Sequence, residues 1–200
     1  MPAPRVTIRA VDLFEEPAFT DLVNEVLHDP DRRRIGELYF GPPGPPPPKS
    51  GAQQVRVGAF AGDALVGWTH AWLQPGGTLY AGNSGVVPAY RRQGVYTQLV
   101  AAIEQQALAL GCLRIHSHHR AANNAVLIAK MKAGYTIVGT ECTLEMGLLL
   151  KMCKELDPRR AEVFRARAGM LEETARFFDE RAAPPSGSGR DLAGPVILRE

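Results

Sequence analysis

The spacing of apolar residues along this chain predicts strands in its first half, with helices between the first two of them. Apolar and polar positions alternate in runs typical of strands. These runs are Arg5–Ala10, Gln54–Phe60, Ala64–Leu73 and Thr78–Val87. Between Glu16 and Leu27 the apolar residues recur every three or four positions, which predicts a helix between the first two strands. A second short helix is predicted over Arg34–Phe40.

Two features inside the predicted strands indicate unusual packing. Trp68, His70 and Trp72 share one face of their strand, where they either belong to the core or line a cleft. Gly82 and Gly85 weaken the next strand, and glycine inside a strand often marks a bulge or a close approach of backbone.

A basic glycine-containing turn precedes the longest predicted helix. The helix is predicted from apolar residues at helical spacing, followed by Gly111 just past its end: Tyr96, Leu99, Val100, Ile103, Ala107 and Leu110. The first N–H groups of a helix have no partner within it and lie at the positive end of its dipole. Arg91 and Arg92 add charge, and Gly94 lets a ligand approach the backbone closely. This turn is therefore predicted to bind phosphate or pyrophosphate.

The second half of the chain continues the alternation of strands and helices. Strands are predicted at Cys112–His118, Thr136–Val138 and Leu144–Met152. Between the first two of these, Asn123 is a typical helix cap and Gly134 a typical helix stop. A further helix is predicted over Pro158–Arg181, with a narrow apolar stripe of Phe164, Ala168, Leu171, Ala175 and Phe178.

Length and charge exclude several classes of protein. The 200 residues suit one domain, or one domain with an appendage. A net charge of +2 gives no strong field for nucleic acid or an anionic membrane, so neither is an expected partner. No apolar run approaches the length of a membrane span, and no secretory leader is recognisable. Three cysteines without metal-ligand spacing fit a reducing compartment, so we expect a cytoplasmic protein.

Two motifs together resemble those of one enzyme family. The turn lacks the spacing of the P-loop and of the dinucleotide-binding loop. The string Val86-x-Pro88-x-Tyr90-Arg91-x-x-Gly94 instead resembles the acetyl-CoA-binding motif of the GNAT N-acetyltransferases, Arg/Gln-x-x-Gly-x-Gly/Ala. The family's second signature, Asn-x-x-Ala-x-x-x-Tyr-x-x-x-Gly-Phe, matches at Asn123, Gly134 and the aromatic Tyr135, with Lys130 at its Tyr position. The resemblance covers roughly residues 6 to 152.

The resemblance implies a fold and a division of the chain. The fold would be the α/β (α+β) GNAT acyl-CoA N-acyltransferase fold. Its central mixed, mostly antiparallel sheet splays between strands 4 and 5 and is flanked by helices, here with an extra C-terminal helix. The acetyltransferase domain would span residues 1–153 and include a proline-rich loop at 41–52. A helical extension at 154–182 and a flexible tail at 183–200 would follow.

The resemblance also implies the cofactor and its contacts. Acetyl-CoA would bind along the fourth strand and the basic turn, through Val86, Val87, Arg91, Arg92, Gln93, Gly94, Val95, Tyr96, Thr97 and Asn123. A backbone N–H at the first two of these residues would stabilise the charge that develops on the thioester oxygen. Tyr96 stands where the family prefers Gly or Ala, so its ring should point away from the phosphates or stack beside the cofactor.

The acetyl group would pass directly to a primary amine of a small molecule or peptide within a ternary complex. An alkylammonium needs a base, and the carboxylate that many relatives carry on the fourth strand is missing here. His118 and His116 are the nearest suitable bases, unless they are only hydrogen-bonded strand residues. Lys130 stands where the family has the acid that protonates the leaving thiolate. No carboxylate or cysteine completes a metal site with the histidines, so no metal is expected.

Two other classes of function remain open from the sequence. A GNAT fold without the usual base and acid can serve as a non-catalytic acyl-CoA-binding or sensing module. The C-terminal apolar stripe can instead pack against a second copy, which would make the protein a homodimer or an interaction protein. The sequence does not identify the acceptor amine.

Overall fold

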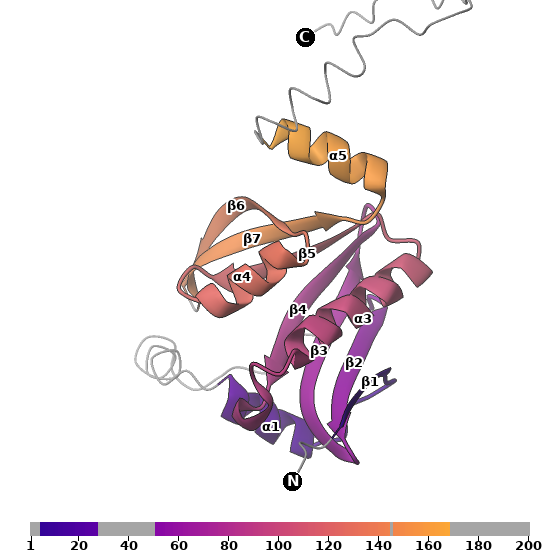
Figure 1. Ribbon diagram of the computed structural model, residues 1–200, viewed down its shortest axis with the longest axis vertical. Helices are drawn as coiled ribbons and strands as arrows, with labels where there is room; N and C mark the ends of the chain where they lie inside the picture. The colour runs from indigo at the N-terminus through magenta and orange to yellow at the C-terminus, as the bar shows by residue number, and fades with distance from the viewer. Residues whose placement is uncertain (1–4, 28–50, 145, 169–200) are drawn as a thin grey trace, which may run out of the picture. The chain divides into compact units, whose positions relative to one another are not determined.

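The computed structural model describes residues 5–27, 51–144 and 146–168 (Figure 1). The chain divides into two compact units, Met1–Ala161 and Glu162–Glu200. The sheet and the helices α1, α3 and α4 all belong to the first unit. The predicted helix over Arg34–Phe40, nearly all of the proline-rich loop, the tail at 183–200 and the stripe beyond Ala168 lie outside the described residues. The predicted domain boundaries stay predictions.

A seven-stranded sheet forms the centre of the first unit, in the order β1-β2-β3-β4-β5-β7-β6. The strands are β1 (Val6–Ala10), β2 (Gln54–Ala61), β3 (Ala64–Gln74), β4 (Thr78–Val86), β5 (Arg114–Arg120), β6 (Thr136–Thr143) and β7 (Gly147–Glu155). All neighbours pair antiparallel except β4 and β5, which run parallel. The predicted mixed, mostly antiparallel sheet is confirmed.

Strands β4 and β5 separate after a short paired stretch. Their register ends with Tyr80 opposite His116, although β4 continues to Val86 and β5 to Arg120. Just beyond Tyr80, β4 carries a bulge, because His70 pairs with Asn83 and its neighbour Ala71 with Ala81, which leaves Gly82 unpaired. Among the described residues, the edge of β4 that faces β5 therefore has no strand partner beyond Tyr80, and the predicted splay is confirmed (Figure 1).

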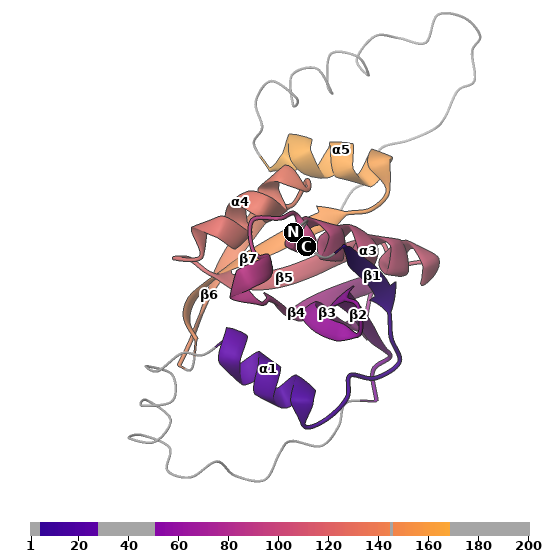
Figure 2. The same ribbon diagram turned by 60° about the horizontal axis from the view of Figure 1, so that its bottom comes forward.

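Helices cover both faces of the sheet (Figure 2). Helices α3 (Val95–Ala109) and α4 (Asn124–Lys132) lie on one face, and α1 (Ala18–Val26) lies on the other. The predicted apolar stripe of α3 is buried at Leu99, Val100, Ile103 and Ala107. Burial of this stripe, rather than helix propensity alone, fixes the position of α3 and so of the turn before it.

The predicted helix ends are confirmed in their backbone geometry. Gly111 and Gly134 have φ of +70° and +86°, the left-handed conformation that glycine adopts readily after a helix. The side chain of Asn123 accepts a hydrogen bond from the N–H of Val126 at 3.4 Å, as an N-cap does. Helix α5 (Pro158–Arg167) begins at the predicted residue, and Asp157 caps it through the N–H of Arg160 at 2.9 Å.

The sequence misplaced the ends of three strands. The predicted strand at Cys112–His118 is β5, which begins only at Arg114. The residue before it, Leu113, donates its N–H to the carbonyl of Gly77, in the turn between β3 and β4. Strand β6 continues to Thr143, beyond the predicted end at Val138, and β7 runs from Gly147 rather than Leu144. Most of β6 is exposed at the edge of the sheet, so pairing with β7 holds it without an apolar pattern.

The three residues that share a face of β3 divide between core and surface. Trp68 is fully buried and meets the ring of Phe19 from α1 edge-on, with 5.6 Å between centroids. Its indole N–H donates to Oδ1 of Asn83 at 2.8 Å. His70 and Trp72 are half-buried.

Among the described residues, no helix is long and apolar enough to cross a membrane.

Candidate active site

The turn before α3 presents a run of unpaired backbone N–H groups. Gly94 and Arg92 have φ of +78° and +61°, and these left-handed residues carry the chain into the helix. The N–H of Arg91 is bonded to Pro88, and the next bonded N–H is that of Gln98, to Gly94. Within the described part of the chain, the N–H groups of residues 92 to 97 have no hydrogen-bond acceptor. Such a row of N–H groups at the positive end of a helix is typical of an anion site.

The two arginines of the turn play different parts. Nε of Arg91 donates to the carbonyl of Val86 at 2.9 Å, so this side chain ties the turn to the end of β4. Arg92 is exposed beside the unpaired N–H groups. The side chain of Gln93 donates to the carbonyl of Ala89 at 2.8 Å and so also stabilises the turn.

Tyr96 and Thr97 lie at the start of α3 with opposite exposure. The ring of Tyr96 packs against the hydrophobic core, and burial raises the pKa of its hydroxyl. The ring therefore points inward, which is the first of the two orientations expected for it. Thr97 is exposed, and Val95 is buried in the core.

The backbone at the end of β4 is only partly available to a ligand. The N–H of Val87 donates to the carbonyl of Val66 at 2.9 Å and is already used. Successive residues of a strand direct their polar groups to opposite edges, so those of Val86 face the gap towards β5. Its carbonyl accepts from Arg91, whereas the N–H of Val86 is a donor beside the gap.

His118 lies between a tyrosine and a glutamate on the α1 face of the sheet. Nδ1 of His118 is 2.9 Å from Oη of Tyr80 on β4, and its Nε2 is 3.2 Å from Oε2 of Glu141 on β6. Burial lowers the pKa of His118, Glu141 opposes this shift, and Lys151 adds to it. The imidazole is therefore neutral near pH 7 and able to accept a proton.

The other two histidines of β5 differ from His118. Burial, with help from Lys151, lowers the pKa of His116, which lies opposite Tyr80 in the strand register. His119 points to the other face, where its Nε2 is 2.9 Å from Oγ of Ser117 and burial lowers its pKa to about 4. No group of three His, Cys, Asp or Glu side chains among the described residues is placed to hold a metal ion.

Lys130 is enclosed on the α4 side of the sheet. Only 2% of it is exposed, and its Nζ lies 4.0 Å from the ring centroid of Tyr135. Burial lowers its pKa from 10.5 to about 8; Glu104 opposes this shift and Lys154 adds to it. Lys154 itself is 2.7 Å from Glu104. The structure thus separates the predicted base and the predicted acid onto the two faces of the sheet.

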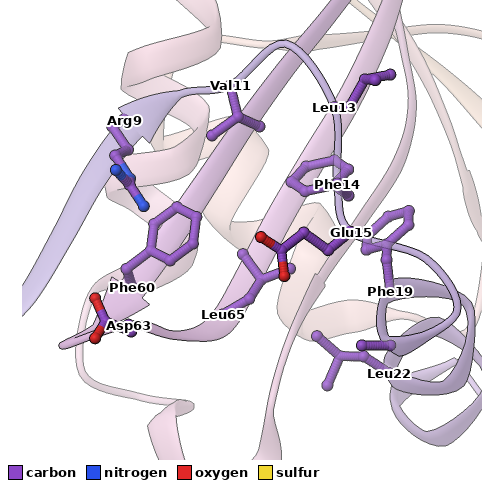
Figure 3. Close-up of a pocket in the computed structure, with 11 residues that line it drawn as sticks. Arg9, Val11, Leu13, Phe14, Glu15, Phe19, Leu22, Phe60, Asp63 and Leu65 are labelled. Carbon is purple, nitrogen blue, oxygen red and sulfur yellow. The ribbon is translucent and has the colours of Figure 1, made fainter.

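A pocket of about 590 Å³ lies at a different place, between β1, α1 and the β2–β3 hairpin (Figure 3). Its walls are largely apolar, with Phe14, Phe19 and Leu65 around the carboxylate of Glu15. The guanidinium of Arg9 covers the ring of Phe60 at 4.2 Å. None of the predicted site residues lines this pocket.

Comparison with known proteins shows which family the chain belongs to. The family model for the acetyltransferase (GNAT) family matches residues 23–135, more than half of the chain. The chain belongs to the GNAT family. It is therefore an acetyl-CoA-dependent N-acetyltransferase, as the two sequence motifs predicted. No curated protein gives a significant match.

Solved structures support the GNAT fold at low sequence identity. The ribosomal-protein-S18-alanine N-acetyltransferase of Escherichia coli is 14% identical with a TM-score of 0.59, covering 76% of this chain and 95% of its own. An acetyltransferase of Bacillus subtilis in complex with CoA is 16% identical, with a TM-score of 0.54 and coverage of 76% and 99%. An aminoglycoside 6'-N-acetyltransferase complexed with coenzyme A is 18% identical, with a TM-score of 0.55 and coverage of 76% and 98%.

Sequence reasoning missed two side chains that contact His118, those of Tyr80 and Glu141. Each comes from a different strand far away in the sequence. The alternation in β4 places Tyr80 on one face, yet only the register with β5 shows that it meets a histidine. Asn123, predicted to contact the cofactor, uses its side-chain oxygen as the cap of α4.

Proposed function

We propose that this GNAT enzyme transfers the acetyl group directly from acetyl-CoA to a primary amine of a small molecule or peptide, within a ternary complex. One observation carries the proposal: the unpaired N–H groups from Arg92 to Thr97 lie at the positive end of α3, next to the gap between β4 and β5. An anion and an extended chain attached to it would satisfy both sets of free backbone groups.

Acetyl-CoA suits this arrangement in both of its parts. Its pyrophosphate would accept hydrogen bonds from the N–H groups of the turn, with the exposed Arg92 adding charge-assisted contacts. Its pantetheine amides would pair with the open edge of β4, as an added strand does. The N–H of Val86 would then face the thioester region and stabilise negative charge on its oxygen during attack.

The proposed base and acid act on opposite sides of the transferred group. An alkylammonium has a pKa near 10, so the acceptor must lose a proton before it attacks. His118 is neutral near pH 7, because burial lowers its pKa, and we assign it as the base, with His116 as its neighbour. Lys130, with a pKa of about 8, is largely protonated at pH 7 and would donate to the thiolate.

The proposal covers more than one kind of acceptor amine. Two of the three neighbours are named for acetylating a ribosomal-protein alanine and an aminoglycoside, so the shared fold accommodates chemically different amines. The three cysteines are free thiols, which supports a cytoplasmic location. A homodimer stays a prediction, which light scattering of the full chain would test.

Calorimetric titration with acetyl-CoA tests the proposal. Replacing Arg91 and Arg92 together by alanine should weaken binding at least about tenfold, equivalent to about 1.4 kcal/mol. Because Arg91 also holds the end of β4, Arg92→Ala alone separates direct charge from turn stability. Arg5→Ala, another exposed arginine, is the matched control and should bind normally.

Unchanged affinity in the double variant would remove the turn as the pyrophosphate site. A second assay measures release of free CoA from acetyl-CoA with a panel of primary amines, amino acids and peptides. Acetyl-CoA binding without acceleration by any of them would count against direct transfer to a primary amine of these classes.

A further inference from the structure

Three side chains from three strands form a continuous hydrogen-bonded row at the point where the sheet splays. Tyr80 is the last residue of β4 that pairs with β5, so its side chain stands at the apex of the gap. Its hydroxyl is 2.9 Å from Nδ1 of His118, and Nε2 of His118 is 3.2 Å from the carboxylate of Glu141. The row therefore leads from the apex of the gap to the exposed carboxylate, which is 54% accessible.

The chemistry of the three groups fixes the direction of every hydrogen bond in the row. A carboxylate only accepts, so Nε2 of the neutral imidazole must carry the hydrogen that faces Glu141. Nδ1 is then the unprotonated nitrogen and must accept the hydrogen of the Tyr80 hydroxyl. The lone pairs of Tyr80 Oη are left to accept a proton from a third group.

The surroundings hold Tyr80 in place and bury it only in part. Its ring lies 4.8 Å from the ring of Trp72, and the side chain is half-buried on the α1 face. Burial and Glu141 raise the pKa of the Tyr80 hydroxyl, so it remains protonated at neutral pH. A protonated phenol can relay a proton when a neutral base is hydrogen-bonded to it and accepts its hydroxyl hydrogen.

We propose that Tyr80 is the residue that touches the acceptor amine, and that Glu141 is a positioning residue that holds His118 in the proton-accepting tautomer. This inference rests on the proposed acetyl transfer and names further residues for it. The acceptor ammonium gives a proton to Tyr80 Oη as the hydroxyl hydrogen moves to His118 Nδ1. The resulting imidazolium is stabilised by Glu141, in the way that a carboxylate supports a catalytic histidine in other enzymes.

Bond formation at the amine is matched by departure of the thiolate. The freed lone pair of the amine forms a C–N bond to the thioester carbon, and the C–S bond then breaks. Of the two protons that nitrogen loses, one passes through Tyr80 to His118 and then to solvent. The other ends on the sulfur of CoA, so the products are the amide, the free thiol of CoA and one proton.

The charged groups around His118 make its protonation measurable. Tyr80 faces it from β4, Glu141 from β6 and Lys151 from β7, and His116 lies two residues away on its own strand. Glu141 raises the pKa of His118 against the effects of burial and Lys151. Removing that carboxylate should therefore lower the pKa of His118 and free the imidazole to adopt either tautomer.

Nitrogen-15 NMR of the histidine rings tests the row without any substrate. Comparison with the spectrum of His118→Gln assigns the signals. We expect the neutral ring of the wild type to carry its hydrogen on Nε2, and Glu141→Gln to give mixed tautomers with a lower pKa. A wild-type ring protonated on Nδ1, or one that is unaffected by Glu141→Gln, would overturn the inference.

Steady-state kinetics with the most active amine of the panel tests the catalytic role. Tyr80→Phe keeps the ring on Trp72 and should lower kcat at least about tenfold, with KM nearly unchanged. Glu141→Gln should lower kcat and move the acid limb of kcat/KM to lower pH, whereas Glu141→Asp should restore part of both. Asp12→Asn removes another exposed carboxylate and should behave as the wild type.

The outcomes distinguish this inference from the function on which it rests. Wild-type kcat in Tyr80→Phe, or an unshifted acid limb in Glu141→Gln, would overturn the relay and leave acetyl transfer standing. No turnover with any amine would instead overturn the proposed transfer and with it the role of Tyr80. The NMR result would still decide whether Glu141 sets the tautomer.

Discussion

Replacing Lys130 by methionine should make the folded protein more stable near neutral pH, although the lysine is a proposed catalytic group. Lys130 is only 2% exposed, and burial lowers its pKa from 10.5 to about 8. A lowered pKa means that the folded state binds the proton less tightly than the unfolded state does. The charge therefore costs stability wherever the lysine is protonated in both states.

The size of the effect follows from the shift. A difference of about 2.5 pKa units corresponds to about 3 kcal/mol at pH 7. Methionine fills a similar volume without charge, but it loses the cation–π contact with the ring of Tyr135 at 4.0 Å, which is worth roughly 1 to 2 kcal/mol. We therefore expect Lys130→Met to be about 1 to 2 kcal/mol more stable than the wild type at pH 7.

The pH dependence provides the sharper test. Stability of the wild type should rise between pH 8 and 10.5, because only the unfolded lysine still binds a proton there. By pH 9.5, about 2 kcal/mol of the cost should have disappeared, so the two proteins should then be nearly equal in stability. Other groups that titrate in this range, such as Cys112 and Cys153, are common to both proteins and cancel in the difference.

Urea unfolding followed by circular dichroism at pH 7 and at pH 9.5 measures both quantities. A difference between the two proteins that does not change with pH would refute the reasoning, because it would show that Lys130 has an ordinary pKa in the folded state. The same variant should lose activity in the CoA-release assay, as expected when a destabilised group is retained for function.

Two further predictions concern close packing and an unpaired hydroxyl. Gly85→Ala should destabilise the fold by about 1 to 3 kcal/mol, because its Cβ would overlap the ring of the fully buried Trp68. Gly139→Ala is the matched control on β6, since nothing lies within 4 Å of its Cβ position, and its unfolding midpoint in urea should stay nearly unchanged. Tyr135→Phe should be neutral or stabilising by up to about 1 kcal/mol in the same assay, because the buried Tyr135 hydroxyl has no hydrogen-bond partner among the described residues. A clear loss of stability would show that this hydroxyl does have a partner.

The family resemblance predicted the sheet and its splay, whereas the residue pattern alone predicted features that depend on neighbouring residues. The turn into α3, the helix stops at Gly111 and Gly134, and the cap at Asn123 each follow from a few adjacent residues and were found where expected. The apolar stripe of α3 was equally readable, because its period of three to four residues is local.

The contacts across the sheet could not be predicted in this way. That His118 meets Tyr80 and Glu141 depends on the register of β4 against β5 and on the position of β6 beyond β7. Both are set by pairing between segments that are far apart in the sequence. The length of β6 was missed for the same reason, since an exposed edge strand needs a partner more than an apolar pattern.

Lys130 replaces the family's tyrosine, and its burial suits it to the proposed role of that residue, protonation of the departing CoA thiolate. Burial at this position would raise the pKa of a tyrosine further above 10, as it does for Tyr96 and Tyr135. The same burial lowers the pKa of a lysine to about 8, close to the value near 8.5 of a thiol. Proton transfer between groups of similar pKa has little free-energy cost, so a buried lysine is better matched to a departing thiolate than a buried phenol would be. Its destabilising charge and its proposed use are thus two results of one cause, the burial of the Lys130 side chain.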